Sequence, residues 1–195
     1  MKNNQSGRSM VEMLGVLAII GVLSAGGLAG YSKAMFKHKL NSTMDQLTML
    51  VTNIRTMYGT QENYADLDVS KAASLGIIAQ SSLSGSVMVN PFKGNVTLEP
   101  GEAKDDVPNS AFVITYDGLP KEACIALATA DWGTGAGSGF ITVAANGTFG
   151  SNISDAPASM AEAYSGKAYE GVPMTVSAAI TACSGTTNAV AIKFY

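Results

Sequence analysis

A long hydrophobic segment lies near the start of the chain. Residues 13–29 carry no charged side chain, and this run of 17 residues is at the lower limit for a helix that spans a membrane. Beyond it, apolar residues recur at alternating steps of four and three positions, the period of an amphipathic helix. The pattern predicts one continuous helix over residues 10–58, about 70 Å long and ended by Gly59. The amphipathic positions are Leu40, Met44, Leu47, Val51, Ile54 and Tyr58.

A cleaved secretory signal peptide is the main alternative for the start of the chain. Residues 24–27 are small enough to form its cleavage site. A retained helix is favoured because the amphipathic pattern continues far beyond such a site. Glu12, at the start of the apolar run, also argues for retention, since a carboxylate at the centre of an inserted helix costs about 2.5 to 3.5 kcal/mol. A residue this costly suggests a specific partner for its carboxylate.

After Gly59 the pattern becomes mixed. Residues 69–75 predict a short helix, and the prolines between residues 91 and 108 indicate a connecting, surface-forming region. Residues 111–116, 124–129, 139–144 and 189–195 have the composition of β-strands. Asn146-Gly147 predicts a tight hairpin turn between residues 141–144 and 148–149.

These elements predict an α+β fold, in which an antiparallel sheet packs on the long helix. The amphipathic stripe is shorter than three heptads, so packing against a head domain is favoured over a coiled-coil seam. The predicted helix-facing positions of the sheet are Val113, Ile125, Leu127, Ile141, Val143, Val190, Ile192 and Phe194.

Composition narrows the function further. With 195 residues and 47% hydrophobic content, the chain is long enough for one domain plus an extension. Its net charge of -3 offers no cationic surface for a nucleic acid. The densest basic cluster, Lys33, Lys37 and Lys39, is interpreted as a collar at the membrane interface, where lysine side chains reach toward water.

Catalytic and metal-binding patterns are missing from the sequence. His38 is the single histidine, and no GxSxG elbow is present. The glycine-rich residues 133–139 lack the spacing of a phosphate-binding loop. We therefore expect no enzyme activity, no cofactor and no metal. The acids nearest to a calcium site fall outside an EF-hand frame; they are Asp66, Asp68, Asp105 and Asp106.

The two cysteines, Cys124 and Cys183, are 59 positions apart, too far for a CxxC redox or zinc motif. A structural disulfide in an oxidising compartment is the favoured interpretation. Two free buried thiols are the alternative.

Residues 7–23 read GRSMVEMLGVLAIIGVL, which resembles the processing site and first helix of type IV prepilins, in particular those of the type IVb branch. The resemblance implies that a prepilin peptidase cleaves after Gly7, that Arg8 becomes the methylated N-terminus, and that Glu12 acts in assembly. It also implies that the disulfide encloses an exposed, partner-facing region at residues 125–182.

The resemblance also divides the chain and places it in the cell. Residues 1–7 are the expected leader, 8–30 the membrane and filament-core helix, 31–58 its amphipathic continuation, and 59–195 the periplasmic or extracellular head of a pilin fold. The precursor is expected in the inner membrane, contacting lipid, the peptidase and the assembly machinery. Copies of the chain then form a helical homopolymer, the surface filament. The alternatives are a minor pilin, a type II secretion pseudopilin, or a membrane-anchored periplasmic binding protein or enzyme.

Two arrangements are open for the Glu12 carboxylate. It is expected to pair with the N-terminal amine of Arg8, in its own or a neighbouring subunit, as the filament forms. The Arg8 guanidinium is the alternative partner within one helix, because the two residues are four positions apart.

Overall fold

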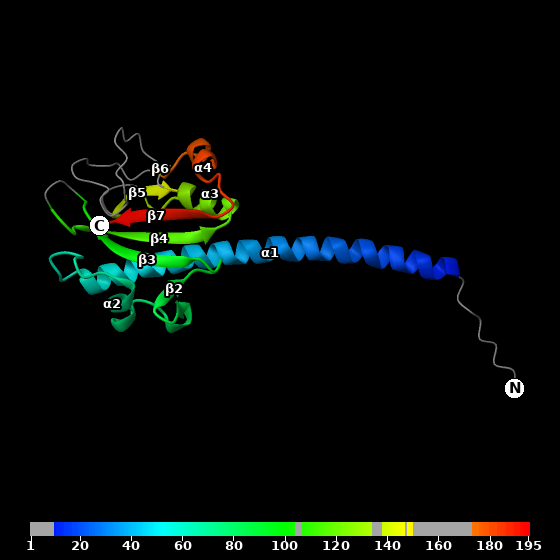
Figure 1. Ribbon diagram of the computed structural model, residues 1–195, viewed down its shortest axis with the longest axis horizontal. Helices are drawn as coiled ribbons and strands as arrows, with labels where there is room; N and C mark the ends of the chain where they lie inside the picture. Colours follow the sequence, from blue (N-terminus) through cyan, green and yellow to red (C-terminus); the bar gives the residue numbers. More distant parts are fainter. Residues whose placement is uncertain (1–9, 104–106, 134–137, 147, 150–172) are drawn as a thin grey trace. The chain divides into compact units, whose positions relative to one another are not determined.

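The protein is described by a computed structural model at residues 10–103, 107–133, 138–146, 148–149 and 173–195 (Figure 1). It divides into two units, Met1–Asn41 and Ser42–Tyr195. The predicted long helix is confirmed as α1, Met10–Tyr58. Gly7 and Arg8 lie outside the described residues.

The part of α1 from Ser42 onward supplies one face of the head core. Its buried residues are Thr43, Leu47, Leu50, Val51, Ile54 and Tyr58. The predicted stripe is therefore confirmed at Leu47, Val51, Ile54 and Tyr58, whereas Met44 is only half-buried. On the solvent side, Thr48, Thr52 and Thr56 are exposed, and each donates its hydroxyl to the carbonyl four residues earlier, at 2.7 to 2.9 Å. This part of the helix is thus amphipathic, as its sequence period requires.

The described residues of the head contain one seven-stranded sheet in which every paired neighbour is antiparallel. The spatial order is β1-β2-β3-β4-β7-β5-β6. The strands are β1 Leu83–Ser84, β2 Val87–Val89, β3 Asn95–Gly101, β4 Ala111–Leu119, β5 Phe140–Ala145, β6 Thr148–Phe149 and β7 Asn188–Phe194. The shorter helices are α2 Val69–Ser74, the 3-10 turn η1 Gln80–Ser82, α3 Lys121–Thr129 and α4 Val176–Ala182.

Two local predictions are confirmed. The short helix expected at residues 69–75 is α2, which begins after Asp68, whose side chain accepts a hydrogen bond from the Lys71 amide. The expected hairpin is the β5–β6 pair, in which Ala145 is paired with Thr148. Asn146 has a positive φ of 48°, the left-handed conformation that tight two-residue hairpin turns require.

The expectation of a mere connecting region before residue 110 was wrong, because β1, β2 and β3 lie there. Pro100 lies within β3, opposite Phe112 of β4. Its missing N–H is tolerated because β2 pairs with β3 only at Asn95 and Val96. Pro100 therefore lies where β3 is an edge strand, the position at which a sheet accepts proline.

The strand predicted at residues 124–129 was also wrong, because these residues form most of helix α3. The helix follows Pro120 and buries Ala123, Cys124, Leu127 and Ala128 at helical spacing. Short apolar runs do not distinguish strand from helix by periodicity alone. Ile125 and Leu127 therefore do not belong to the sheet, and helix α4 was not predicted.

The sheet packs one face on α1. Phe112, whose ring centroid lies 4.9 Å from that of Tyr64, is paired with Phe194 of β7. The Arg55 guanidinium of α1 lies 5.4 Å from the Phe194 ring centroid, and Arg55 Nε donates to the Tyr195 backbone oxygen at 3.0 Å. Side chains alternate between the two faces of a strand, so Phe112 and Phe194 identify the α1-facing positions on β4 and β7.

The predicted helix-facing set is partly correct. Val190, Ile192 and Phe194 share the face toward α1, and Val143 is paired with Ile192 on the same face. Val113 was assigned wrongly. It is paired with Lys193, and both point to the opposite face, since side chains alternate along a strand. The apolar character of Val113 did not reveal its face, because β4 is buried on both sides. Ile141 lies in a register shift of β5.

Two polar side chains are fully buried on opposite faces of this sheet. Tyr116 is on the face toward α1, and its hydroxyl has no hydrogen-bond partner in the part of the chain that the structure describes. Burial raises the pKa of Tyr116. On the other face, burial lowers the pKa of Lys193 to about 8, while the charge of Glu102 acts to raise it.

We expect Tyr116→Phe to stabilise the head by about 1 kcal/mol, because a buried hydroxyl without a partner costs about 1 to 3 kcal/mol. The measurement is urea unfolding of the full chain in detergent, followed by the fluorescence of Trp132, the single tryptophan. Tyr31→Phe, at an exposed tyrosine of α1, is the matched control and should have no effect. A loss of stability in Tyr116→Phe would show that the hydroxyl is hydrogen-bonded.

The head should become more stable as the pH rises from 7 to 9.5. The pKa of Lys193 falls from its ordinary 10.5 to about 8 on folding, so the unfolded chain binds more protons in this range and stability increases with pH. The expected gain is about 2 kcal/mol. Lys193→Met should remove this gain, whatever its effect on absolute stability. Urea unfolding at several pH values tests both statements, and an equal slope in the variant would contradict them.

Candidate functional site

The first unit presents an exposed apolar helix surface. Its most apolar 18-residue window has a mean hydropathy of 2.1, and none of it is buried within the described structure. By length and composition this helix is able to cross a membrane. Large apolar side chains such as Leu14, Ile19 and Leu23 are exposed along it. A continuous surface of this kind requires lipid or another protein to cover it.

Charged residues bracket this surface at a spacing that matches a bilayer. Glu12 lies in the first turn of α1 and is exposed. The next charged residue is Lys33, so the 20 residues from 13 to 32 are uncharged. At the helical rise per residue they span about 30 Å, the thickness of a hydrocarbon core. Lys33 and Lys37 are exposed one turn apart just beyond it, which fits the predicted collar.

The glycines of this helix leave open positions on its surface. A Cβ built at Gly15, Gly21, Gly26, Gly27 or Gly30 would meet no atom within 4 Å. Gly26 and Gly30 lie one turn apart, in the spacing that lets two helices approach closely. The same positions suit packing against a membrane helix or against another copy of α1.

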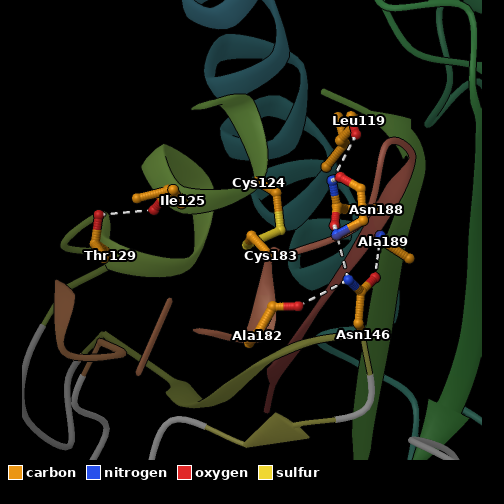
Figure 2. Close-up of a disulfide and its surroundings, with 10 residues drawn as sticks. Leu119, Cys124, Ile125, Thr129, Asn146, Ala182, Cys183, Asn188 and Ala189 are labelled. Atoms are coloured by element: carbon orange, nitrogen blue, oxygen red, sulfur yellow. Dashed lines mark hydrogen bonds between the residues drawn. A yellow bond between two sulfur atoms is a disulfide. The ribbon is translucent and has the colours of Figure 1, made fainter. Parts of the chain in front are cut away.

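In the head, a disulfide joins the two small helices beyond the sheet (Figure 2). Cys124 of α3 and Cys183, the C-cap of α4, are bonded with their Cα atoms 5.9 Å apart, and both are fully buried. This bond confirms the predicted pairing and excludes the free-thiol alternative. The loop that it closes contains β5, β6 and α4.

Two asparagines next to the disulfide connect the segments that meet there (Figure 2). The buried Asn188 donates from Nδ2 to the Leu119 and Gly185 carbonyls at 3.3 and 3.0 Å. Asn146 Nδ2 donates to Asn188 Oδ1 at 2.8 Å and to the Ala182 carbonyl at 2.9 Å. The network thus joins the end of β4, the β5–β6 turn, the end of α4 and the start of β7.

A third asparagine, Asn90, organises the turn between β2 and β3. Its Oδ1 accepts hydrogen bonds from the Phe92 and Gly94 amides, and its Nδ2 donates to the Asp117 carbonyl at 2.8 Å. Of the three asparagines, only Asn146 was predicted as a structural residue from the sequence. Asn146 had a signal in its Asn-Gly turn, whereas Asn90 and Asn188 had none that separates them from solvent-exposed loop residues.

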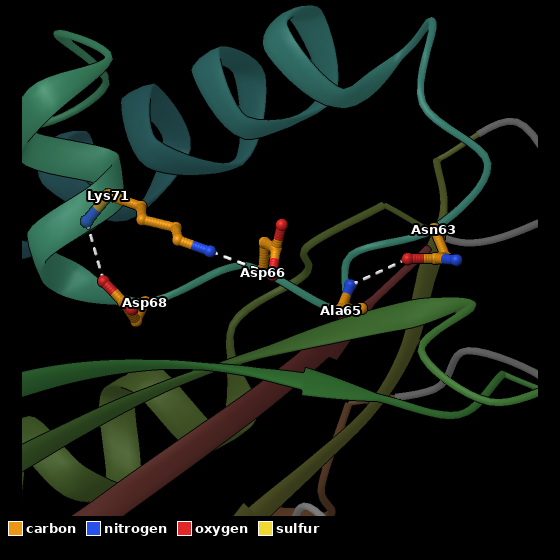
Figure 3. A network of polar contacts seen from close by, with 5 residues as sticks. All are labelled: Asn63, Ala65, Asp66, Asp68 and Lys71. Atoms are coloured by element: carbon orange, nitrogen blue, oxygen red, sulfur yellow. Dashed lines mark hydrogen bonds and ion pairs between the residues drawn. The ribbon is translucent and has the colours of Figure 1, made fainter.

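Asp66 and Asp68, two of the four acids considered as calcium ligands, stabilise local structure (Figure 3). Asp68 Oδ1 accepts from the Lys71 amide at 2.7 Å as the cap of α2, and Asp66 forms an ion pair with Lys71 Nζ at 2.9 Å. Asp105 and Asp106 lie outside the described residues. Among the residues that are described, no group of three His, Cys, Asp or Glu side chains could hold a metal ion.

Comparison with known proteins gives matches along the whole chain. A family model described as PilS N terminal matches residues 37–194. The major structural subunit of bundle-forming pilus from Escherichia coli O111:H- is 24% identical over 201 residues, covering 100% of this chain and 95% of that protein. The toxin coregulated pilin of Vibrio cholerae is 30% identical over 134 residues, covering 66% of this chain and 58% of that protein.

Solved structures show the same fold. The crystal structure of type IV b pilin from Salmonella typhi has a TM-score of 0.55 at 18% identity, covering 78% of this chain and 97% of that chain. The structure of TcpA, a type IV pilin from Vibrio cholerae El Tor biotype, has a TM-score of 0.50 at 20% identity, covering 81% and 99%. The family match extends over most of the sequence and over the whole of the head that α1 and the sheet build, so the chain belongs to the PilS family and is a type IVb-like pilin.

Proposed function

We propose that the chain is a structural subunit of a type IV pilus, held in the inner membrane by α1 as a precursor and then polymerised through α1 into a surface filament. The observation that carries this proposal is the uncovered apolar surface of α1 on a chain with a separately folded head. Such a surface needs lipid in the precursor, and after extraction from the membrane it needs the helices of neighbouring subunits.

A role in the body of the filament is favoured over that of a minor pilin or pseudopilin. The relative named as a major structural subunit aligns with the whole of this chain. Glu12 supports the same choice, because a carboxylate at the start of an apolar helix is costly unless a partner compensates its charge. The relatives named as pilus subunits support a structural role over that of an enzyme.

Processing follows from the proposal. A prepilin peptidase cleaves after Gly7, and Arg8 becomes the methylated N-terminus of the mature chain. Residues 1–7 form the polar leader that this cleavage removes. Removing it places a positive amine four residues before the Glu12 carboxylate, which one helical turn spans.

The pairing of this amine with Glu12 gives the polymer its axial register. In a low-dielectric setting an unpaired carboxylate is strongly penalised, so subunits that dock with the amine beside Glu12 are favoured over those that are displaced along the axis. The interaction therefore selects a register more than it adds stability. The Arg8 guanidinium competes for the same carboxylate within one helix.

Cleavage is tested by mass spectrometry of the N-terminus of filament protein. We expect a mature chain of 188 residues, since seven of the 195 are removed. Gly7→Ala should leave a full-length precursor in the membrane fraction and no filaments, because the peptidase requires the glycine before the cleaved bond. An N-terminus near residue 26 would restore the secretory signal peptide and overturn the proposal.

The assembly role of Glu12 is tested by Glu12→Gln, which keeps the shape of the side chain and removes its charge. We expect normal processing and membrane insertion, with sheared filaments reduced to less than about one tenth of wild type, because the register-selecting charge pair is lost. Glu62→Gln, the same change at an exposed acid just after α1, is the control and should still assemble. Normal piliation in Glu12→Gln would show that Glu12 is only an interfacial charge.

A further inference from the structure

Two lysines of α1 share one face of the helix just beyond its apolar segment. Lys33 and Lys37 are both exposed. They are four positions apart, which places them on one helix face with their Cβ atoms about 5 to 6 Å from each other. Each ammonium group ends a flexible four-carbon stem, so both groups can reach one anion between them. These two residues are named here the lysine pair.

No acid lies near the lysine pair along the helix. The 32 residues from 13 to 44 contain no aspartate or glutamate, so neither lysine has a carboxylate three or four positions away. Within the described parts of the chain, neither lysine forms an ion pair. Two like charges one turn apart repel each other. An anion from outside the chain is therefore favourable at this position.

The depth of the lysine pair in a bilayer indicates which anion is available there. The uncharged residues 13–32 span about 30 Å, the thickness of the hydrocarbon core. With this segment in the core, the lysine side chains extend to the level of the lipid headgroups. Tyr31 is 65% exposed at the same end of the segment, and tyrosine is enriched at this interface. The anionic group that a bilayer offers at this level is the phosphate of a phospholipid.

Membrane topology does not account for the lysine pair. Two positively charged residues, Lys2 and Arg8, precede the apolar segment, whereas Lys33, Lys37 and Lys39 follow it. The more positive flank of a spanning helix tends to stay in the cytoplasm. In the proposed precursor this flank and the head lie outside the cytoplasm, so the lysines oppose the tendency. An anionic partner in the outer leaflet gives these charges a role that orientation does not.

The helix surface next to the lysine pair leaves room for an acyl chain. Gly26 and Gly30 precede Lys33 and Lys37 by seven positions each, a spacing that keeps all four residues on one helix face. A Cβ built at either glycine would meet no atom within 4 Å. The glycines do not select a ligand by themselves. They allow an acyl chain to lie close along the helix when its phosphate is held by the lysines.

We propose that in the membrane precursor the lysine pair binds the phosphate of an anionic phospholipid in the outer leaflet of the inner membrane. The inference rests on the proposed function, which supplies the membrane and the orientation of α1. An anionic lipid is the occupant because its charge complements two lysines that have no acid beside them. A zwitterionic lipid carries its own cation, which competes with the lysines for the phosphate. The attraction acts over about 8 Å at physiological salt, so it depends on where the lysines lie.

The lipid that stays bound to the full-length precursor tests this inference. The precursor is placed in nanodiscs of phosphatidylcholine with about one fifth phosphatidylglycerol at about 0.15 M salt, and after transfer to mild detergent the bound lipids are counted by native mass spectrometry. We expect phosphatidylglycerol to be enriched about fivefold over its bulk fraction, and Lys33→Gln/Lys37→Gln to lose this enrichment. Lys93→Gln/Lys121→Gln, at two exposed lysines of the head, is the matched control and should keep it.

A charge-matched variant separates a site from a general attraction between cations and anionic lipid. Ala34→Lys/Lys37→Gln keeps the charge of the helix, but the two lysines are then adjacent in sequence and do not face each other. This variant should lose most of the enrichment. Enrichment equal to that of wild type, either here or in Lys33→Gln/Lys37→Gln, would overturn the inference.

Two further measurements identify the occupant and keep the failures distinct. In nanodiscs of phosphatidylcholine alone, inorganic phosphate that binds only when both lysines are present would show that a free anion is the occupant, and the lipid would be ruled out. Sheared filaments of wild type test the proposed function separately. Filaments without enrichment in the precursor would overturn only the inference, whereas enrichment without filaments would support lipid binding and remove the proposed function.

Discussion

The packing of one face of α1 against the sheet is the interaction on which the head depends. Leu47, Leu50 and Ile54 are almost fully buried, and the paired β4 and β7 present Phe112 and Phe194 to the same helix. A sheet that is apolar on the face toward a helix cannot be stable in water without it. Because the same helix carries the exposed apolar segment of the first unit, the residues that fold the head also belong to the element that must find lipid or other subunits. Folding and assembly therefore share one helix.

A second set of constraints holds α3, α4 and the β5–β6 turn of the head in place. The disulfide joins α3 to α4, and the Asn146–Asn188 network ties the β5–β6 turn, β4 and β7 to the same place. Buried asparagine side chains are stabilising only when their donors and acceptors are matched, and both make several hydrogen bonds here. In the chain-entropy account, a bond that closes a loop of 59 positions contributes roughly 4 kcal/mol. Together these bonds hold α4 so that Ala179 and Ala182 face inward, while Val176 and Ile180 are exposed.

The exposed apolar residues of the two units have different consequences. Those of α1 in the first unit are continuous and extend over the thickness of a bilayer, so they can be covered by lipid before they are covered by protein. The exposed apolar residues of the head, such as Val176 and Ile180 of α4, belong to a folded unit and do not require lipid.

The sequence by itself determined the long helix, its end at Gly59, most of its buried stripe, the α2 helix, the hairpin at Asn146 and the cysteine pair. These follow from the local hydrophobic period, from turn chemistry, and from the number and spacing of the cysteines, none of which depends on how the rest of the chain packs. The tertiary structure decided that residues 124–129 are a helix, that Val113 faces away from α1, and that Pro100 lies within a strand. Each depends on which neighbours are present: β4 is buried on both faces, and β3 has an open edge at Pro100. The exposure of Val176 and Ile180 on α4 and the hydrogen bonds of Asn188 were also decided there, because exposure and hydrogen-bond partners are properties of the packed chain and leave no period in the sequence.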